Sequence, residues 1–154
     1  MIFRNFRIRL GLAAARMAIV SRNYPKGYEA ATALSRKFPN DERVLTLLAD
    51  ASLFIADVSV SERCYNRAIS LLDSSVSLSN DSKRFLRAYI SYRLLEVGFL
   101  QGHGKGVPKT HIVKEINNIP AGSSIRTLFF MDTHCSDIPR PYGSRSAAKR
   151  CAEL

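Results

Sequence analysis

The 154-residue sequence contains no tryptophan and only three cysteines, Cys64, Cys135 and Cys151, none of them in a C-x-x-C pair. Cysteines this few and this scattered exclude a disulfide framework and favour a reducing compartment. No apolar run approaches the roughly 18 residues that a membrane-spanning helix needs. We therefore expect a soluble, cytoplasmic protein without a membrane span, long enough to bury a core of its own.

The sequence also lacks the common motifs of catalytic sites. No G-x-S-x-G elbow occurs, and the glycine-rich stretch 102–106 does not match the phosphate-binding pattern G-x-x-x-x-G-K-[ST]. Residues 132–137 hold four potential metal ligands, but the two other imidazoles, His103 and His111, are distant in sequence, so a metal site is not expected. We expect no enzyme activity, no cofactor, no metal and no small-molecule substrate.

Acidic residues are absent from the first 28 positions, which carry six basic side chains. Residues 29–97 carry nine charges of each sign, and residues 98–154 carry eight basic and four acidic ones, so the net charge of +10 resides at the two ends. Basic ends favour an acidic partner such as nucleic acid, an anionic membrane or an acidic protein face. An arginine-rich, acid-free start is also typical of mitochondrial transit peptides, which leaves a mitochondrial location as the alternative. Lipid binding by this segment is disfavoured because Ala13 to Ala15 are small.

Apolar residues spaced three and four apart predict five helices within residues 1–98. The first helix should end near Arg22 and carry a buried stripe, and a turn at residues 23–27 that includes Gly27 should follow it. Gly98 should stop the fifth helix. Asn40 or Asp41 should cap the third helix, and Asn80-Asp81 repeats that start signal before the fifth. The other expected ranges are about Pro25 or Tyr28 to Lys37, 41–56, 61–72 and 82–97, with a serine-rich loop at 73–81. The stripe expected to be buried in the first helix comprises Phe3, Phe6, Leu10, Ala13, Ala14, Met17 and Val20.

Residues 45–73 follow a two-helix spacing: Leu45-x2-Leu48-Ala49-x2-Ser52, then Ser61-x3-Tyr65-x2-Ala68, with Asp73 where a proline would stand. This pattern resembles the tetratricopeptide repeat, in which small residues let successive helices lie close together. One unit earlier the same register places Leu10, Ala13, Ala14 and Met17 in the first helix and Ala33 in the second, 35 residues before Ala68. The resemblance covers about residues 5–97 and implies a right-handed superhelix that holds a peptide or helix of another protein.

We therefore predict an all-α fold, an antiparallel helix-hairpin array of the tetratricopeptide-like, right-handed solenoid kind with an irregular basic C-terminal tail. The predicted organisation is a helical repeat domain at 1–98, a flexible connector at 99–109, further helices at 110–135 and the tail at 136–154.

The predicted function is that of a non-catalytic scaffold or adaptor that binds another polypeptide in its groove, as part of a larger complex. The contact residues expected on the inner side are Arg16, Tyr24, Asp50, Tyr65, Arg87 and Tyr92. The alternative is a basic structural subunit of a ribonucleoprotein that reaches RNA phosphates through its two ends. The residues expected to do so are Arg4, Arg7, Arg9, Arg140, Arg145, Lys149 and Arg150.

Overall fold

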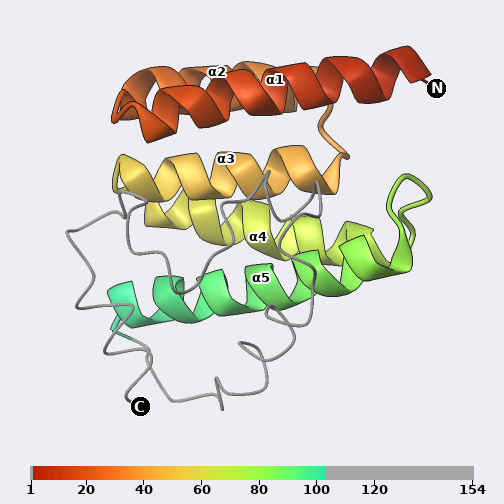
Figure 1. Ribbon diagram of the computed structural model, residues 1–154. Helices are drawn as coiled ribbons and strands as arrows, with labels where there is room; N and C mark the ends of the chain where they lie inside the picture. Colours follow the sequence, from red (N-terminus) through yellow and green to blue (C-terminus); the bar gives the residue numbers. More distant parts are fainter. Residues whose placement is uncertain (1, 103–154) are drawn as a thin grey trace.

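The computed structural model describes residues 2–102, apart from the side chains of Ile2 and Phe99, and this part of the chain is all-helical with no strand (Figure 1). The prediction of an all-α fold is therefore confirmed for these residues. The predicted helices at 110–135 and the predicted tail at 136–154 lie outside them. The five helices are α1 (Ile2–Val20), α2 (Tyr24–Lys37), α3 (Glu42–Phe54), α4 (Val58–Leu72) and α5 (Asn80–Leu100).

Side-chain caps explain where the helices begin. Asp41 Oδ1 accepts hydrogen bonds from the amides of Arg43 at 3.1 Å and Val44 at 3.3 Å, as the sequence predicted for the start of α3. Asn23 accepts from the amide of Lys26 at 3.4 Å at the start of α2. Asp57 likewise accepts from the amide three residues ahead, at 3.1 Å, at the start of α4. Each cap thus occupies at least one of the amides that a helix start leaves without a backbone partner.

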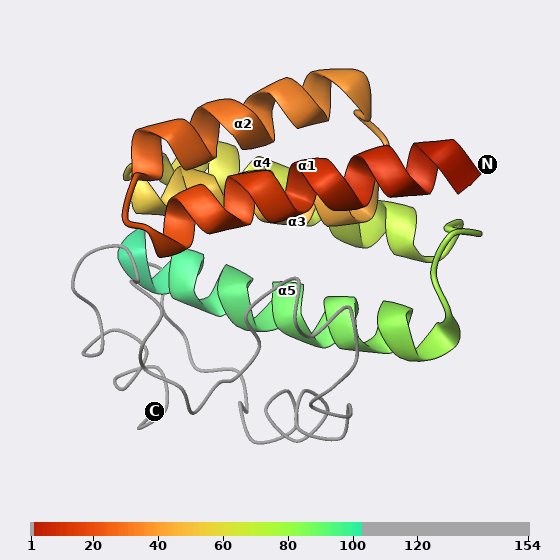
Figure 2. The same cartoon turned by 45° about the horizontal axis from the view of Figure 1, so that its top comes forward.

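The helices stack in the order of the chain. Each helix packs against the next, and α1 also contacts α3. In Figure 1, α1 and α2 form one layer, α3 and α4 the next, and α5 the last, and Figure 2 shows the same order from another side. Both views place α1, α3 and α5 on one side of the molecule and α2 and α4 on the other. The short turns within α1–α2 and α3–α4 make each of these pairs an antiparallel hairpin.

The two hairpin turns repeat the same geometry 34 positions apart. Arg22 and Ala56 are the two non-glycine residues with positive φ among the described residues, at 60° and 67°. The amide that follows each of them bonds back to an equivalent carbonyl at 2.9 Å, Asn23 to Ala18 and Asp57 to Ser52. The residue with the bonded amide is the helix cap in both turns. Sequence positions 34 apart are therefore structurally equivalent in the two hairpins.

This equivalence corrects the register of the first unit. The predicted register makes Ala33 the equivalent of Ala68 in the first unit, yet Ala33 is exposed. Leu34, which lies 34 residues before Ala68, is buried. Ala15 lies 34 residues before Ala49, and both are fully buried. A 35-residue offset misassigned the contact because a shift of one position turns a helical residue by about 100°. In the second unit the predicted packing residues are all buried, namely Leu45, Leu48, Ala49, Ser52, Ser61, Tyr65 and Ala68.

The predicted buried stripe of α1 is wrong, because that stripe faces outward. Phe3 is 84% exposed and Phe6 64%. The core face of α1 is formed by Ile8, Leu12, Ala15 and Ile19, all essentially buried. Helical periodicity cannot decide between two apolar faces of one helix, because both satisfy the same spacing. The rest of the predicted stripe is also exposed, at Leu10, Ala13, Ala14, Met17 and Val20.

Two glycines behave differently from expectation. Gly98 was expected to end the fifth helix, but α5 continues to Leu100, two residues into the predicted connector, and the turn follows at Gly102 with φ of +76°. Gly27, expected in a turn, lies buried inside α2, where an added Cβ would meet Ile19 Cγ1 at 2.7 Å. Its lack of a side chain therefore allows α2 to lie close against α1.

Candidate functional site

The candidate site begins with a buried polar cluster that joins α3, α4 and α5. Asp50 of α3 accepts hydrogen bonds from the hydroxyl of Tyr65 in α4, from the hydroxyl of Tyr89 in α5 at 2.7 Å, and from Arg93 Nε at 3.3 Å. Arg93 Nε also donates to Tyr65 Oη at 3.1 Å, and its Nη1 donates to Glu96. We call these five residues, Asp50, Tyr65, Tyr89, Arg93 and Glu96, the Asp50 network. All five are buried.

Burial dominates the electrostatics of this network. It raises the pKa of the Asp50 carboxyl, although the charge of Arg93 and the hydrogen bonds from the two tyrosines lower it in part. Burial also raises the pKa values of Tyr65 and Tyr89 well above the usual tyrosine value, with a contribution from the Asp50 charge. The pKa of Arg93 is raised because the surrounding acidic groups, Glu96 first, outweigh the lowering by burial. The two phenols and the guanidinium thus stay protonated over the physiological range.

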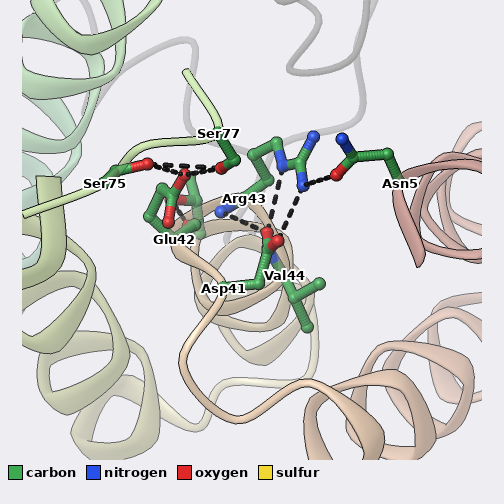
Figure 3. Close-up of polar contacts among 8 residues, drawn as sticks. Asn5, Asp41, Glu42, Arg43, Val44, Ser75 and Ser77 are labelled. Atoms are coloured by element: carbon green, nitrogen blue, oxygen red, sulfur yellow. Dashed lines mark hydrogen bonds and ion pairs between the residues drawn. The ribbon is translucent and has the colours of Figure 1, made fainter. Parts of the chain in front are cut away.

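A second polar cluster lies at the start of α3 (Figure 3). Glu42 Oε1 accepts hydrogen bonds from the hydroxyls of Ser75 at 2.8 Å and Ser77 at 3.1 Å, which fastens the α4–α5 loop. Arg43 pairs with Asp41 at 2.7 Å, and its Nη2 donates to Asn5 of α1 at 3.4 Å. Charges this well buried need such partners, because leaving one unpaired costs several kcal/mol. Together the two clusters connect α3 to α1 at one end and to α5 further along.

The structure distributes the six predicted contact residues among different environments. It brings Asp50 and Tyr65 into direct contact, but both lie inside the protein with their polar atoms bonded within the Asp50 network. Tyr92 is also buried, at 8% exposure. Tyr24 is half-buried, with its ring stacked on Phe54 at a centroid distance of 5.0 Å. The other two are Arg16, half-buried on α1, and Arg87, exposed on α5 and paired with Asp73 at 2.5 Å.

Sequence reasoning missed the three members of the network on α5. A signal was available, since Tyr89, Arg93 and Glu96 follow one another at helical spacing and so share a face. Asp50, the partner of Tyr89 and Arg93, is 39 residues or more away in sequence, and no local pattern indicates such a pairing.

The basic residues predicted to reach phosphates are only partly placed. Arg4, Arg7 and Arg9 are exposed on α1, and the Arg4 guanidinium lies 5.9 Å from the centre of the Phe38 ring. The remaining four, Arg140, Arg145, Lys149 and Arg150, lie outside the described residues, as does the possible ligand cluster at 132–137. Among residues 2–102, no group of three or more His, Cys, Asp or Glu side chains is arranged to hold a metal ion.

The Asp50 network links helices through hydrogen bonds and ion pairs among its own members. Its groups satisfy one another inside the protein, and they belong to three different helices. Such networks fix the relative placement of the elements that they join. No protein-family model, no curated protein and no solved structure matches this chain. The architecture of residues 2–102 defines an all-helical class in which each helix packs against the next.

Proposed function

We propose that this chain is a non-catalytic helical-repeat scaffold, similar to tetratricopeptide-repeat proteins, that binds another polypeptide within a larger complex. The observation that carries this proposal is the recurrence of one hairpin turn at 34 positions, with the left-handed residue, the cap and the return hydrogen bond all equivalent. A spacing of 34 residues between helix pairs is that of the tetratricopeptide repeat. Repeats of this kind stack through nearest neighbours and present an extended surface to a partner.

The packing order supports the same proposal. Contacts run from each helix to its successor, and the first helices of the two hairpins, α1 and α3, also touch. α5 stands where the first helix of a third unit would stand, after the loop that Glu42 fastens. The Asp50 network then holds α5 against the α3–α4 hairpin. A frame connected in this way keeps its surface shape when a partner binds, which lowers the entropic cost of binding.

The partner surface that we propose is the side formed by α1, α3 and α5. Asn5 faces α3 through its contact with Arg43, and Arg16 follows it by eleven residues, which is about three helical turns and so the same side of α1. Asp50 and Tyr65 are not part of this surface, because the protein's own groups occupy their polar atoms. We assign them the role of positioning α5 instead.

The mass of the native particle tests the proposal. The full chain should be purified from its own cells under native conditions and weighed by native mass spectrometry. We expect a particle larger than the 17.2 kDa chain that contains a second polypeptide in a fixed ratio. A particle with the mass of this chain alone, or of copies of it alone, would overturn the proposal. If ribonuclease removes all the added mass, the ribonucleoprotein alternative replaces it.

A site-specific cross-link tests the surface. A photoreactive phenylalanine analogue placed at Arg16 should cross-link to the co-purifying polypeptide. The matched control carries the same analogue at Arg63, an exposed residue of α4, which belongs to the opposite side of the array. Equal cross-linking from both positions would contradict the assignment of the partner to the α1–α3–α5 side.

A further inference from the structure

The helix α1 has two apolar faces, and the protein uses one of them for its core. Turning by about 100° per residue, the exposed apolar side chains fall within a sector of roughly 120° that lies opposite the buried ones. We call this sector the outer face of α1. Its exposed large side chains are Phe3, Phe6, Leu10, Met17 and Val20, with exposed fractions between 45% and 84%.

The outer face concentrates the exposed apolar surface of the described part of the chain. Beyond α1, the large apolar side chains that are exposed there are Ile55 and Val76, which stand apart in two different turns. Single exposed apolar residues are ordinary, but a contiguous row of five along one helix marks an interaction surface. Ala13 and Ala14 fall within the same sector and keep the row continuous.

Arginines border the outer face and no acid lies near it in sequence. At helical spacing, Arg7 falls on one edge of the apolar sector and Arg9 on the other, and both are exposed. Residues 1–28 contain no Asp or Glu. An apolar stripe with bulky side chains, edged by arginines and free of acids, is the composition of helices that lie in the interface of an anionic bilayer.

We propose that the outer face of α1 docks this protein onto an anionic lipid surface. Phe3, Phe6 and Leu10 enter the boundary between headgroups and acyl chains, while Arg7 and Arg9 extend to the lipid phosphates on either side. The helix lies flat, which suits its 19 residues and a length of about 28 Å. Among the described residues no helix is long and apolar enough to cross a membrane, so the contact is peripheral.

The observations favour lipid over other occupants of this face. A second copy of the chain would bring two arginine-bordered, acid-free faces together, and their charges would repel. RNA would engage the arginines but would leave Leu10, Met17 and Val20 without a role. From the sequence alone, the small size of Ala13 to Ala15 disfavours lipid binding. That reason does not apply to the outer face, because Ala15 belongs to the core and the exposed row includes two phenylalanines.

Vesicle flotation tests the apolar part of the contact. The full chain should float with vesicles of equal parts phosphatidylcholine and phosphatidylglycerol, and much less with phosphatidylcholine alone. The double variant Phe3→Ser/Phe6→Ser should bind at least about tenfold more weakly, since each ring contributes on the order of a tenfold affinity when buried. The control Val76→Ser removes an apolar side chain that is 92% exposed in the α4–α5 loop and should change nothing.

Charge variants test the arginines. Arg7→Gln/Arg9→Gln should weaken binding to the anionic vesicles several-fold and flatten its dependence on salt. The control Arg36→Gln/Arg63→Gln removes the same charge from exposed positions on α2 and α4 and should bind like the wild type. An equal loss in both double variants would overturn the assignment to α1, because net charge alone would then explain the binding.

The sequence contains no tryptophan, so a single introduced tryptophan reports insertion of the helix into the bilayer by its fluorescence. Replacing a phenylalanine by tryptophan also keeps an apolar group at that position. In Phe6→Trp the fluorescence should shift to shorter wavelength with anionic vesicles, whereas in Val76→Trp it should not. The proposal is overturned if the full chain ignores anionic vesicles at low salt, if Phe6→Trp shows no shift, or if Phe3→Ser/Phe6→Ser binds them normally. The proposal is also overturned if the wild-type chain does not bind vesicles but forms a dimer, or binds RNA, and Phe3→Ser/Phe6→Ser abolishes that dimer or that RNA binding.

Discussion

Replacement of Asp50 by alanine should destabilise the protein by about 3 kcal/mol, because it removes one partner of a buried ion pair. The carboxylate accepts hydrogen bonds from three buried donors, on Tyr65, Tyr89 and Arg93. A buried donor left without an acceptor costs about 1–3 kcal/mol. The sum is reduced because Arg93 keeps Glu96, Tyr65 still accepts from Arg93, and the desolvation of Asp50 itself is relieved. The result should therefore lie toward the lower end of the roughly 3–5 kcal/mol that breaking such pairs costs.

Urea unfolding followed by far-ultraviolet circular dichroism measures this change as a shift of the midpoint at constant slope. The matched control is Asp73→Ala, which removes an aspartate from an ion pair with Arg87 in which the carboxylate is 83% exposed. Exposed pairs contribute less than about 1 kcal/mol, so this variant should unfold close to the wild type. Asp50→Asn, which keeps the volume and one acceptor, should fall between the two. Equal midpoints for Asp50→Ala and Asp73→Ala would refute the idea that the Asp50 network holds α5 in place.

Three further predictions concern packing and pH. Ala68→Leu should destabilise the protein by about 1–3 kcal/mol through overpacking of a buried position. Ala33→Leu, at an exposed position, should stay within about 0.5 kcal/mol of the wild type. Equal effects of the two variants in thermal unfolding would contradict the 34-residue register. Gly27→Ala should lower stability, because its Cβ would meet a buried isoleucine at 2.7 Å, whereas Gly98→Ala, which meets nothing within 4 Å, should raise it by up to about 1 kcal/mol. The two phenols of the Asp50 network have raised pKa values, so their contribution to stability is complete below the unfolded tyrosine pKa of about 10 and is lost as the pH rises beyond it. Tyrosinate absorbance should show these two groups ionising only together with unfolding; their ionisation in the folded state would contradict the prediction.

Local chemistry made the helix boundaries predictable to within a few residues. The side chain of Asp41 caps α3 with bonds that span two or three residues, and the serine-rich stretch after Asp73 forms the expected loop. The end of α5 was missed because a glycine lowers helix propensity by only about 1 kcal/mol, which tertiary contacts override. Gly98 therefore lies within the helix.

The candidate site was predictable only in fragments. Asp50 and Tyr65 were identified as residues of the inner side, but as contacts for a partner and not as partners of each other. Their hydrogen bond joins two helices of one hairpin, and the bonds to Tyr89 and Arg93 join that hairpin to α5. Long-range pairings of this kind depend on how the helices cross, which the spacing along one helix does not specify.

By itself, the sequence determined where helices form, that Asn40 or Asp41 caps the third of them, and where charge is missing, because these properties depend on neighbours within a few positions. The tertiary structure alone decided which of the two apolar faces of α1 enters the core. It also decided which residues of successive hairpins are equivalent, and that Arg93 pairs with both Asp50 and Glu96. Each of these outcomes follows from close packing between helices distant in sequence, since a helix offers several faces and only the fit with its neighbours selects one.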